Sequence, residues 1–143
     1  MLLDTNVLAA GMAGDLRAST TPPTRIWRHW LEKRFALLIS EHVLAELGRT
    51  FEDPWFVAQI ASSDRDRQFE ILTRDAEIVE VAVVVEGVAA HPADDFVLAA
   101  AVSGNADYLV TGDVKFRTVD EHRGVKIRTP REFLAELDAA LFS

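Results

Sequence analysis

Acidic side chains recur at one kind of position in this sequence, directly after short apolar runs or early in the segments that follow them. Four of them stand out: Asp4, Glu46, Asp95 and Asp113. A fifth acid, Asp94, directly precedes Asp95. Carboxylates that gather in one place raise each other's pKa and repel unless a cation lies among them. An all-oxygen cluster suits a hard divalent ion, Mg²⁺ or Mn²⁺, which also binds phosphate groups. The acids therefore predict a site for one or two such ions and chemistry on a phosphate.

Each acid also has an ordinary structural interpretation when it is taken alone. Asp4 could cap a helix, and Glu46 could lie in solvent on a helix surface. Asp94 or Asp95 could face the positive end of a helix dipole, and Asp113 follows a glycine in a turn. Independent caps and turns have no reason to meet at one edge of a sheet, so their convergence favours a site.

The elements that must position the acids alternate between short apolar strands and amphipathic helices. Strands are expected at residues 1–3, 35–39, 78–85, 108–111 and 125–127. Helices are expected from residue 4, over 23–34 and 40–51, across 55–76 with a charged joint at 64–67, from 94 or 95 to 102, and from 130, with a loop at 13–23. This alternation predicts a three-layer α/β/α fold with a central parallel sheet of about four to five strands. Ligands bind such sheets at the carboxyl ends of the strands, where the acids stand.

Length and composition limit the class of protein. The 143 residues predict a single domain over 1–143, and the absence of Cys excludes disulfides and thiolate metal sites. No apolar run approaches the ~18 residues of a membrane span, and the start of the chain leaves no room for a signal peptide. We therefore expect a soluble, cytoplasmic protein without membrane contact.

The charge distribution bears on the substrate. A net charge of -8 argues against broad electrostatic adhesion to nucleic acid. Basic residues nevertheless gather between Leu16 and Arg34, where Glu32 is the only acid. Arg25 and Arg28 in this stretch are candidate RNA-binding residues. A solvated helix face is an equally good interpretation of them.

Histidine and tryptophan offer weaker signals. His42 and Glu46 are four residues apart, a spacing that could hold zinc or iron, but the other histidines form no zincin-like motif with them. We interpret Trp27, Trp30 and Trp55 as core or interface residues rather than platforms for stacking bases. A dimer surface that includes Trp27 and Trp30 stays an open alternative.

Four motifs in order along the chain resemble those of PIN-domain ribonucleases. They are Asp4-Thr5-Asn6-Val7-Leu8, Ser40 with Val43-Leu44-Ala45-Glu46-Leu47, His91-Pro92-Ala93-Asp94-Asp95 before an apolar helix, and Ala106-Asp107-Tyr108-Leu109-Val110-Thr111-Gly112-Asp113. The resemblance extends from Met1 to Leu134. It is closest to the bacterial branch of VapC-like toxins from toxin–antitoxin pairs.

The resemblance implies a metal-dependent endoribonuclease that cleaves single-stranded RNA with a metal-activated water. The family's acidic site falls on Asp4, Glu46, Asp95 and Asp113, which would hold one or two Mg²⁺ or Mn²⁺ ions. Asp95 is chosen because the fourth and fifth residues after it are alanines, and Asp94 is an additional candidate ligand.

The resemblance also implies supporting residues and partners. Asn6 and Thr111 resemble polar residues that hydrogen-bond the family's carboxylates. His91 stands where relatives carry Asp, which predicts an altered charge at the rim of the site. A small antitoxin and a second copy of the chain are the implied protein partners.

Other functions stay open at this point. One is a PIN nuclease of RNA processing that is not a toxin, and another is a catalytically weak α/β binding module with a cation site. Thr5 and Asn6 stand where a nucleotide-binding loop would carry glycines, which disfavours a nucleotide site. Asn6 also replaces the second aspartate of haloacid-dehalogenase-like phosphatases. Catalysis by the four acids is the favoured interpretation.

Overall fold

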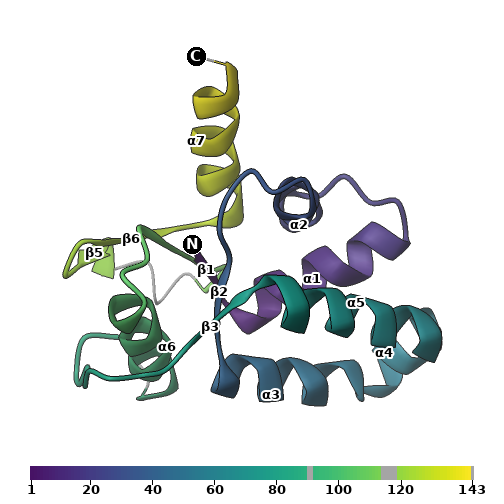
Figure 1. The fold of residues 1–143 in the computed structure, drawn as a ribbon, viewed down its shortest axis with the longest axis horizontal. Coiled ribbons are helices and arrows are strands. Elements are labelled where there is room, and N and C mark those ends of the chain that lie inside the picture. Colours follow the sequence, from purple (N-terminus) through teal and green to yellow (C-terminus); the bar gives the residue numbers. More distant parts are fainter. Residues whose placement is uncertain (90–91, 114–118, 143) are drawn as a thin grey trace.

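A mixed sheet flanked by helices forms the centre of the molecule (Figure 1). The structure is a computed structural model that describes residues 1–89, 92–113 and 119–142. The strands of this part are β1 (Leu2–Leu3), β2 (Leu38–Ser40), β3 (Glu77–Val79), β4 (Tyr108–Val110), β5 (Glu121–His122) and β6 (Val125–Arg128). The helices are α1 (Thr5–Leu16), α2 (Pro22–Leu31), α3 (Glu41–Phe51), α4 (Pro54–Gln59), α5 (Ser62–Asp75), α6 (Pro92–Ser103) and α7 (Pro130–Phe142).

The strand order brings the ends of β1 and β4 together. Across the described residues the sheet runs β3-β2-β1-β4-β6-β5, and only β5 is antiparallel to its neighbour. Leu2 in β1 pairs with Leu38 on one side and with Leu109 on the other. Parallel neighbours end at the same edge, so the residues that follow β1, β2 and β4 share that edge. This architecture confirms the predicted α/β fold with a mostly parallel sheet.

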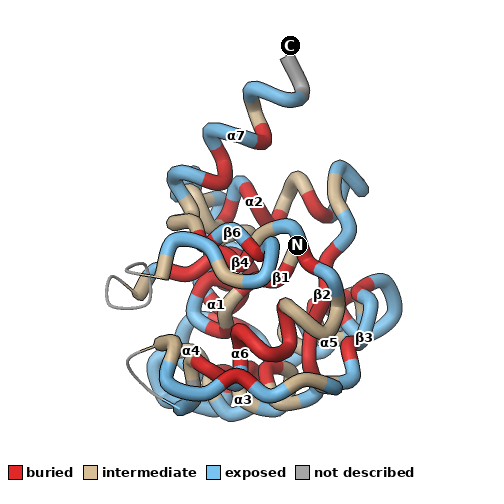
Figure 2. The backbone as a smooth tube through the Cα atoms, turned by 90° about the vertical axis from the view of Figure 1, so that its left-hand side faces the viewer, coloured by how far each residue is buried: buried red, intermediate tan, exposed pale blue. Residues whose placement is uncertain are grey.

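Helices cover both faces of the sheet. Figure 1 shows α1, α3, α4 and α5 on one side of the strands and α6 on the other. The buried residues concentrate where these layers meet the sheet (Figure 2). β1 is central and apolar on both sides, and Leu2 and Leu3 are fully buried, as a parallel strand between two helical layers requires.

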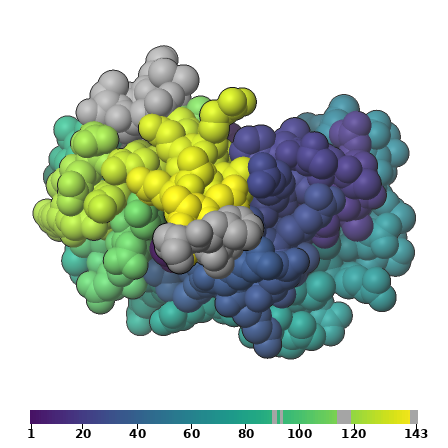
Figure 3. Space-filling model, turned by 90° about the horizontal axis from the view of Figure 1, so that it is seen from above, coloured from purple at the N-terminus to yellow at the C-terminus, as the bar shows by residue number. Residues whose placement is uncertain are grey.

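Helix α2 packs tightly on α1 because two glycines of α1 leave room for it. A Cβ at Gly11 would lie 2.7 Å from the carbonyl oxygen of Pro23, and a Cβ at Gly14 would overlap the hydroxyl of Thr24. Trp27 and Trp30 of α2 are buried, with ring centroids 5.1 Å apart, which confirms their prediction as core residues. Helix α7 lies next to α2 (Figure 3), where Asp138 forms an ion pair with Arg25.

Two predicted boundaries are wrong because tertiary packing overrides local sequence signals. The loop expected from residue 13 begins only after Leu16, since Met12 and Ala13 are buried and extend the apolar face of α1. The joint expected at 64–67 lies instead at 60–61, between α4 and α5. Ile60 is extended and buried there, so the break follows core packing rather than charge.

The strand predicted at 78–85 is also shorter than expected. β3 ends at Val79, and residues 80–89 form no strand. Side chains replace a partner strand for this segment: the hydroxyl of Ser103 accepts the backbone N–H groups of Ala82 and Val83 at 2.9 and 3.3 Å. The other differences are smaller: β2 spans 38–40 rather than 35–39, and the two-residue β5 is not foreseen.

None of the helices in the described residues is both long enough and apolar enough to cross a membrane.

Candidate active site

A cavity of about 420 Å³ opens at the carboxyl edge of the sheet, and we call it the acid cavity. Four carboxylates from separate segments line it, together with polar residues: Asp4, Glu46, Asp94 and Asp113, with Thr5, Asn6, Arg49, Thr50 and Val97. The strand order explains this convergence, because Asp4 and Asp113 follow the neighbouring strands β1 and β4. Glu46 comes from α3, which follows β2, and Asp94 comes from the first turn of α6.

Asp4 is held in place by the neighbouring strand β4, by Thr111 after that strand, and by the start of α1. Its backbone N–H donates to the carbonyl of Val110 at 2.9 Å, which fixes the residue at the end of β1. Its Oδ1 accepts the backbone N–H of Thr5 at 2.8 Å, so Asp4 caps α1. Its Oδ2 accepts the Thr111 hydroxyl at 3.0 Å. Asp4 therefore caps α1 and also belongs to the group of acids, so the two interpretations of this residue are compatible.

The pKa of Asp4 shows the electrostatic cost of this arrangement. Burial raises the pKa of Asp4 above its ordinary value, and the charges of Glu46 and Asp113 raise it further. The hydrogen bonds from Thr111 and Thr5 act in the opposite direction and do not compensate fully. The carboxylate is thus poised to accept a positive charge, either a proton or a cation.

Two threonines connect the acids. Thr111 is completely buried; its hydroxyl donates to Asp4 and accepts the backbone N–H of Asp113 at 3.1 Å. This places Thr111 in the supporting position that the resemblance implies. The hydroxyl of Thr5 donates to Oε2 of Glu46 at 2.8 Å. A hydroxyl can rotate and bond to either protonation state, so both threonines orient the acids without fixing their charge.

Glu46 has a second neighbour in His42. Nε2 of His42 lies 3.2 Å from Oε1 of Glu46, one helical turn away, and the imidazole ring packs against Phe96 with 4.9 Å between centroids. His42 therefore orients Glu46 from the outside of the acid cavity. It is not among the residues that line that cavity.

The structure reverses the predicted placement of Asp94 and Asp95. Asp94 lines the acid cavity, whereas Asp95 is 6% exposed and lies outside it. The Asp95 carboxylate accepts three backbone N–H groups, from Gly87 at 3.0 Å, Val88 at 3.2 Å and Ala89 at 2.7 Å. Adjacent residues of a helix point about 100° apart, so only one of the pair can face the cavity. Asp95 instead anchors the segment before α6.

Arg49 is the site residue that the sequence analysis missed. It lies on α3 three residues after Glu46, on the same side of the helix, and lines the acid cavity. The spacing from Glu46 is the signal that could have identified it. Asn6 also lines the cavity, as an exposed residue of α1.

Arg25 and Arg28 do not line the acid cavity. Arg28 donates to Asp15 at 2.8 Å and to the carbonyl of Ser19 at 2.7 Å, which ties α2 to the end of α1. Arg25 pairs with Asp138 of α7 at 3.3 Å. Both side chains join helices at some distance in sequence from the acids, and their proposed contact with RNA stays a prediction. His91 lies outside the described residues.

The donor set of the acid cavity is chemically suited to a hard divalent cation, because every candidate ligand is a carboxylate or hydroxyl oxygen. The elevated pKa of Asp4 fits the same conclusion. As the side chains stand, however, no three His, Asp or Glu residues of the described ranges form a group that could hold a metal ion. Mg²⁺ typically keeps several waters and uses only one or two protein carboxylates.

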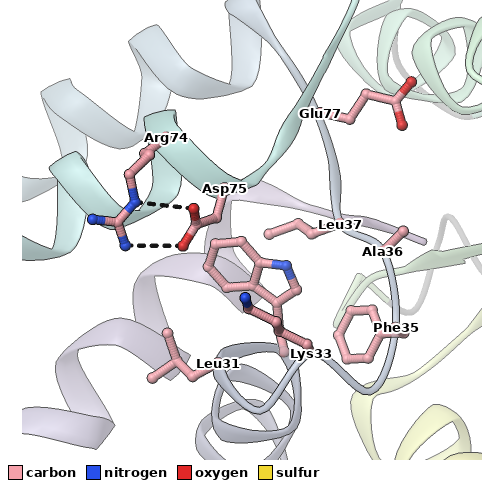
Figure 4. Close-up of a pocket in the computed structure, with 9 residues that line it drawn as sticks. Leu31, Lys33, Phe35, Ala36, Leu37, Arg74, Asp75 and Glu77 are labelled. Atoms are coloured by element: carbon pink, nitrogen blue, oxygen red, sulfur yellow. Dashed lines mark hydrogen bonds and ion pairs between the residues drawn. The ribbon is translucent and has the colours of Figure 1, made fainter.

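A different cavity of about 390 Å³ lies at the opposite edge of the sheet, near the amino ends of β2 and β3, and we call it the basal cavity (Figure 4). Its lining is aromatic, aliphatic and charged: Trp30, Leu31, Lys33, Phe35, Ala36, Leu37, Arg74, Asp75 and Glu77. Arg74 donates two hydrogen bonds of 3.0 Å to Asp75. None of the predicted catalytic acids lies there.

Comparisons with known proteins agree with the geometry. A sequence profile described as a PIN domain matches residues 1–115. The crystal structure of PAE2754 from Pyrobaculum aerophilum is similar in fold, with a TM-score of 0.65 and 19% sequence identity over 96% of this chain and 88% of that chain. A search of curated proteins found no match. Because the profile covers most of the chain, including every acid of the acid cavity, this protein belongs to the PIN-domain family.

Proposed function

We propose that this protein is a divalent-metal-dependent endoribonuclease that hydrolyses single-stranded RNA at the acid cavity. The observation that supports this proposal is the convergence of Asp4, Glu46, Asp94 and Asp113, from four segments of the chain, on one cavity. PIN domains are generally nucleases, so the fold already favours phosphodiester hydrolysis. Mg²⁺ or Mn²⁺, as one or two ions, is the proposed cofactor.

The four carboxylates would hold the metal, with Asp94 in the place that the sequence analysis gave to Asp95. When bound, a divalent ion supplies an activated water and neutralises charge on the phosphoryl group. The residues of the chain prepare this site: Thr5 and Thr111 fix the direction of the Asp4 oxygens, and His42 holds Glu46. Residues that hydrogen-bond to metal ligands in this way typically orient those ligands.

The substrate strand would contact the protein through Arg49. Its guanidinium group lines the acid cavity and provides the positive charge that a phosphate diester needs beside four carboxylates. The water oxygen attacks phosphorus, the bond to the 3′ oxygen breaks, and the proton ends on that oxygen. The products are a 5′-phosphate and a 3′-hydroxyl.

The biological role that fits the resemblance is that of a toxin in a toxin–antitoxin pair, with a small antitoxin protein and a second copy of the chain as partners. Expression of the wild-type protein in a host without an antitoxin should then arrest growth. Expression of the Asp4→Asn variant at an equal level should not. Equal growth with both proteins favours the alternative, a PIN nuclease of RNA processing.

A cleavage assay on mixed RNA tests the enzymatic proposal. Wild-type protein should cut single-stranded RNA with Mg²⁺ or Mn²⁺, and excess EDTA should stop the reaction. Because the substrate must reach the carboxylates as a single strand, a duplex of the same sequence should be cut much more slowly. Cleavage that continues undiminished in excess EDTA contradicts the proposed mechanism.

A further inference from the structure

A second cavity, of about 540 Å³, adjoins the acid cavity, and we call it the Trp55 cavity. The two cavities share Asn6 and Thr50 in their linings, so they are neighbouring parts of one depression on α1 and α3. Small residues of α1, Ala9, Ala10 and Ala13, line the Trp55 cavity and leave space above the helix. A strand that enters the acid cavity can therefore continue into the Trp55 cavity.

Trp55 presents an aromatic face to solvent at this cavity. It is 47% exposed, whereas the other two tryptophans of the chain, Trp27 and Trp30, are 1% and 6% exposed. Helix α4 buries none of its own residues, so hydrophobic packing does not explain a tryptophan at this position. Tryptophan is enriched at interfaces, because its large ring offers apolar contact area and its N–H can bond to a polar partner.

The indole ring is also held firmly. The backbone N–H of Trp55 donates to Asp53 at 3.0 Å, and its ring meets Phe56 edge to face with 4.7 Å between centroids. Phe56 packs in turn on the core residue Phe51, with 5.0 Å between centroids. The guanidinium carbon of Arg17 lies over the ring of Trp55, 5.5 Å from its centroid. An exposed aromatic ring together with an arginine has the chemistry of a stacking platform for a nucleobase.

We propose that the Trp55 cavity binds one unpaired base of the single-stranded RNA whose scissile phosphate lies in the acid cavity. This inference rests on the proposed function and adds a base-binding subsite to it. Trp55 stacks on the base, Arg17 contacts the base plane or the adjoining phosphate, and Asn6 and Thr50 offer polar groups along the path between the two cavities. Every base has a π face, so the subsite selects an unpaired base rather than a particular sequence.

Charge also favours an RNA strand as the occupant. Arg49 lines the acid cavity and Arg17 lines the Trp55 cavity, so the depression carries cations at both of its parts. The four carboxylates of the acid cavity outnumber Arg49, so a phosphate in that cavity needs the proposed divalent ion as well, whereas Arg17 has no acid beside it in the lining of the Trp55 cavity. Backbone phosphates are neutralised by side chains placed in this way.

Fluorescence tests the subsite independently of cleavage. Only Trp55 is exposed, so a single-stranded RNA oligonucleotide added to the Asp4→Asn protein should quench its emission, and a duplex of the same sequence should not. The quench should disappear in the Asp4→Asn, Trp55→Phe protein. Absence of a quench, or a quench that persists without Trp55, overturns the proposal.

A competing occupant is a second copy of this chain, and the same reporter reveals it. Acrylamide quenching of Trp55 without RNA should be independent of protein concentration if the cavity is free for a base. Quenching that falls as the concentration rises means that another copy covers Trp55, and it overturns the proposal.

Steady-state cleavage of single-stranded RNA separates this inference from the proposed function. Trp55→Ala should raise KM about 5-fold to 150-fold, the range for loss of a stacking side chain, with little change in kcat. Trp55→Phe should retain most of the affinity, because it keeps a ring. Val57→Ala is the matched control, since Val57 is exposed on the same helix and does not line the cavity. If wild type cleaves but Trp55→Ala behaves as Val57→Ala does, the subsite is rejected while the nuclease assignment stands.

Discussion

The acid cavity and the basal cavity lie at opposite edges of one sheet. The acid cavity brings like charges together, whereas the basal cavity pairs opposite charges. In the basal cavity Arg74 and Asp75 form two hydrogen bonds with each other, and the bonds from Arg74 lower the pKa of Asp75. In the acid cavity like charges meet, and burial together with Glu46 and Asp113 raises the pKa of Asp4. The basal cavity thus pairs opposite charges, whereas the acid cavity gathers four carboxylates beside one arginine.

This difference indicates which of the two cavities is functional. A fold gains nothing in stability from gathering carboxylates, because each charge raises the cost of ionising the next. Such a cost persists in native proteins mainly where the arrangement serves function. The acid cavity has this character and the basal cavity does not. Variants of the two cavities should therefore affect stability and activity in different combinations.

The largest expected effect comes from Asp4→Asn. Asparagine keeps the cap of α1 and the contact with Thr111, but it removes the charge. RNA cleavage should fall by more than the roughly 10-fold to 100-fold loss typical of residues that only orient a metal ligand. The melting temperature of the metal-free variant at pH 7 should be higher than that of wild type. Cleavage rates with Mn²⁺ and thermal unfolding in EDTA measure the two effects.

The control for this variant is Asp75→Asn in the basal cavity. Asp75 is exposed and pairs with its neighbour in sequence, Arg74, so its loss should leave cleavage unchanged and alter stability little. If Asp4→Asn behaves as Asp75→Asn does in both measurements, the contrast between the cavities is wrong.

A smaller effect, but a more specific one, distinguishes Asp94 from Asp95. Asp94→Asn should reduce cleavage, because Asp94 lines the acid cavity, and should lower the free energy of unfolding less than Asp95→Asn does. Asp95→Asn should lower the free energy of unfolding by about 1 to 3 kcal/mol, since an amide cannot accept all three backbone N–H groups. Urea denaturation and cleavage assays on both variants are the measurements. Loss of cleavage in a stable Asp95→Asn protein, with normal cleavage by Asp94→Asn, would return the catalytic role to Asp95.

The same pair of residues shows where sequence reasoning succeeds and where it stops. The parallel sheet and the position of Asp4 and Asp113 after their strands follow from short apolar runs and from the rules of parallel sheets, whereas the strand order comes from the structure. The choice between Asp94 and Asp95 does not follow, because α6 is apolar on all sides and its sequence does not mark which face meets the cavity. The orientation depends on the segment 87–89, whose backbone N–H groups capture Asp95.

Long-range contacts explain the other differences. Arg25 and Arg28 look like a basic face in the sequence, but Asp138 and Asp15 become their partners only when the helices pack. Trp55 resembles a core residue in sequence, yet α4 buries none of its side chains. The ion pairs of the two arginines and the exposure of Trp55 are both set by tertiary structure, so the local sequence does not indicate either of them.

The smallest expected effect is the pH dependence of stability, and its sign separates the two cavities. The folded state raises the pKa of Asp4 above 3.8, so folded protein holds its proton at pH values where unfolded protein has released it. The stabilising effect of this proton is fully present below pH 3.8 and is lost as the pH rises through the elevated value. For Asp75 the pKa is lowered, so its contribution has the opposite sign: it is present above the ordinary value and is lost as the pH falls through the lowered one.

Subtracting the unfolding free energy of a variant from that of wild type isolates each contribution. In EDTA, the difference between wild type and Asp4→Asn should become less favourable to wild type as the pH rises through the window above 3.8. Mg²⁺ should oppose this trend, because an ion that binds only the folded protein at 100 times its Kd adds about 2.7 kcal/mol of stability. The same subtraction with Asp75→Asn should show a slight trend of opposite sign and no response to Mg²⁺. A Mg²⁺-independent difference for Asp4→Asn would mean that the acid cavity accepts protons but not the divalent ion, which would separate its electrostatics from the proposed catalysis.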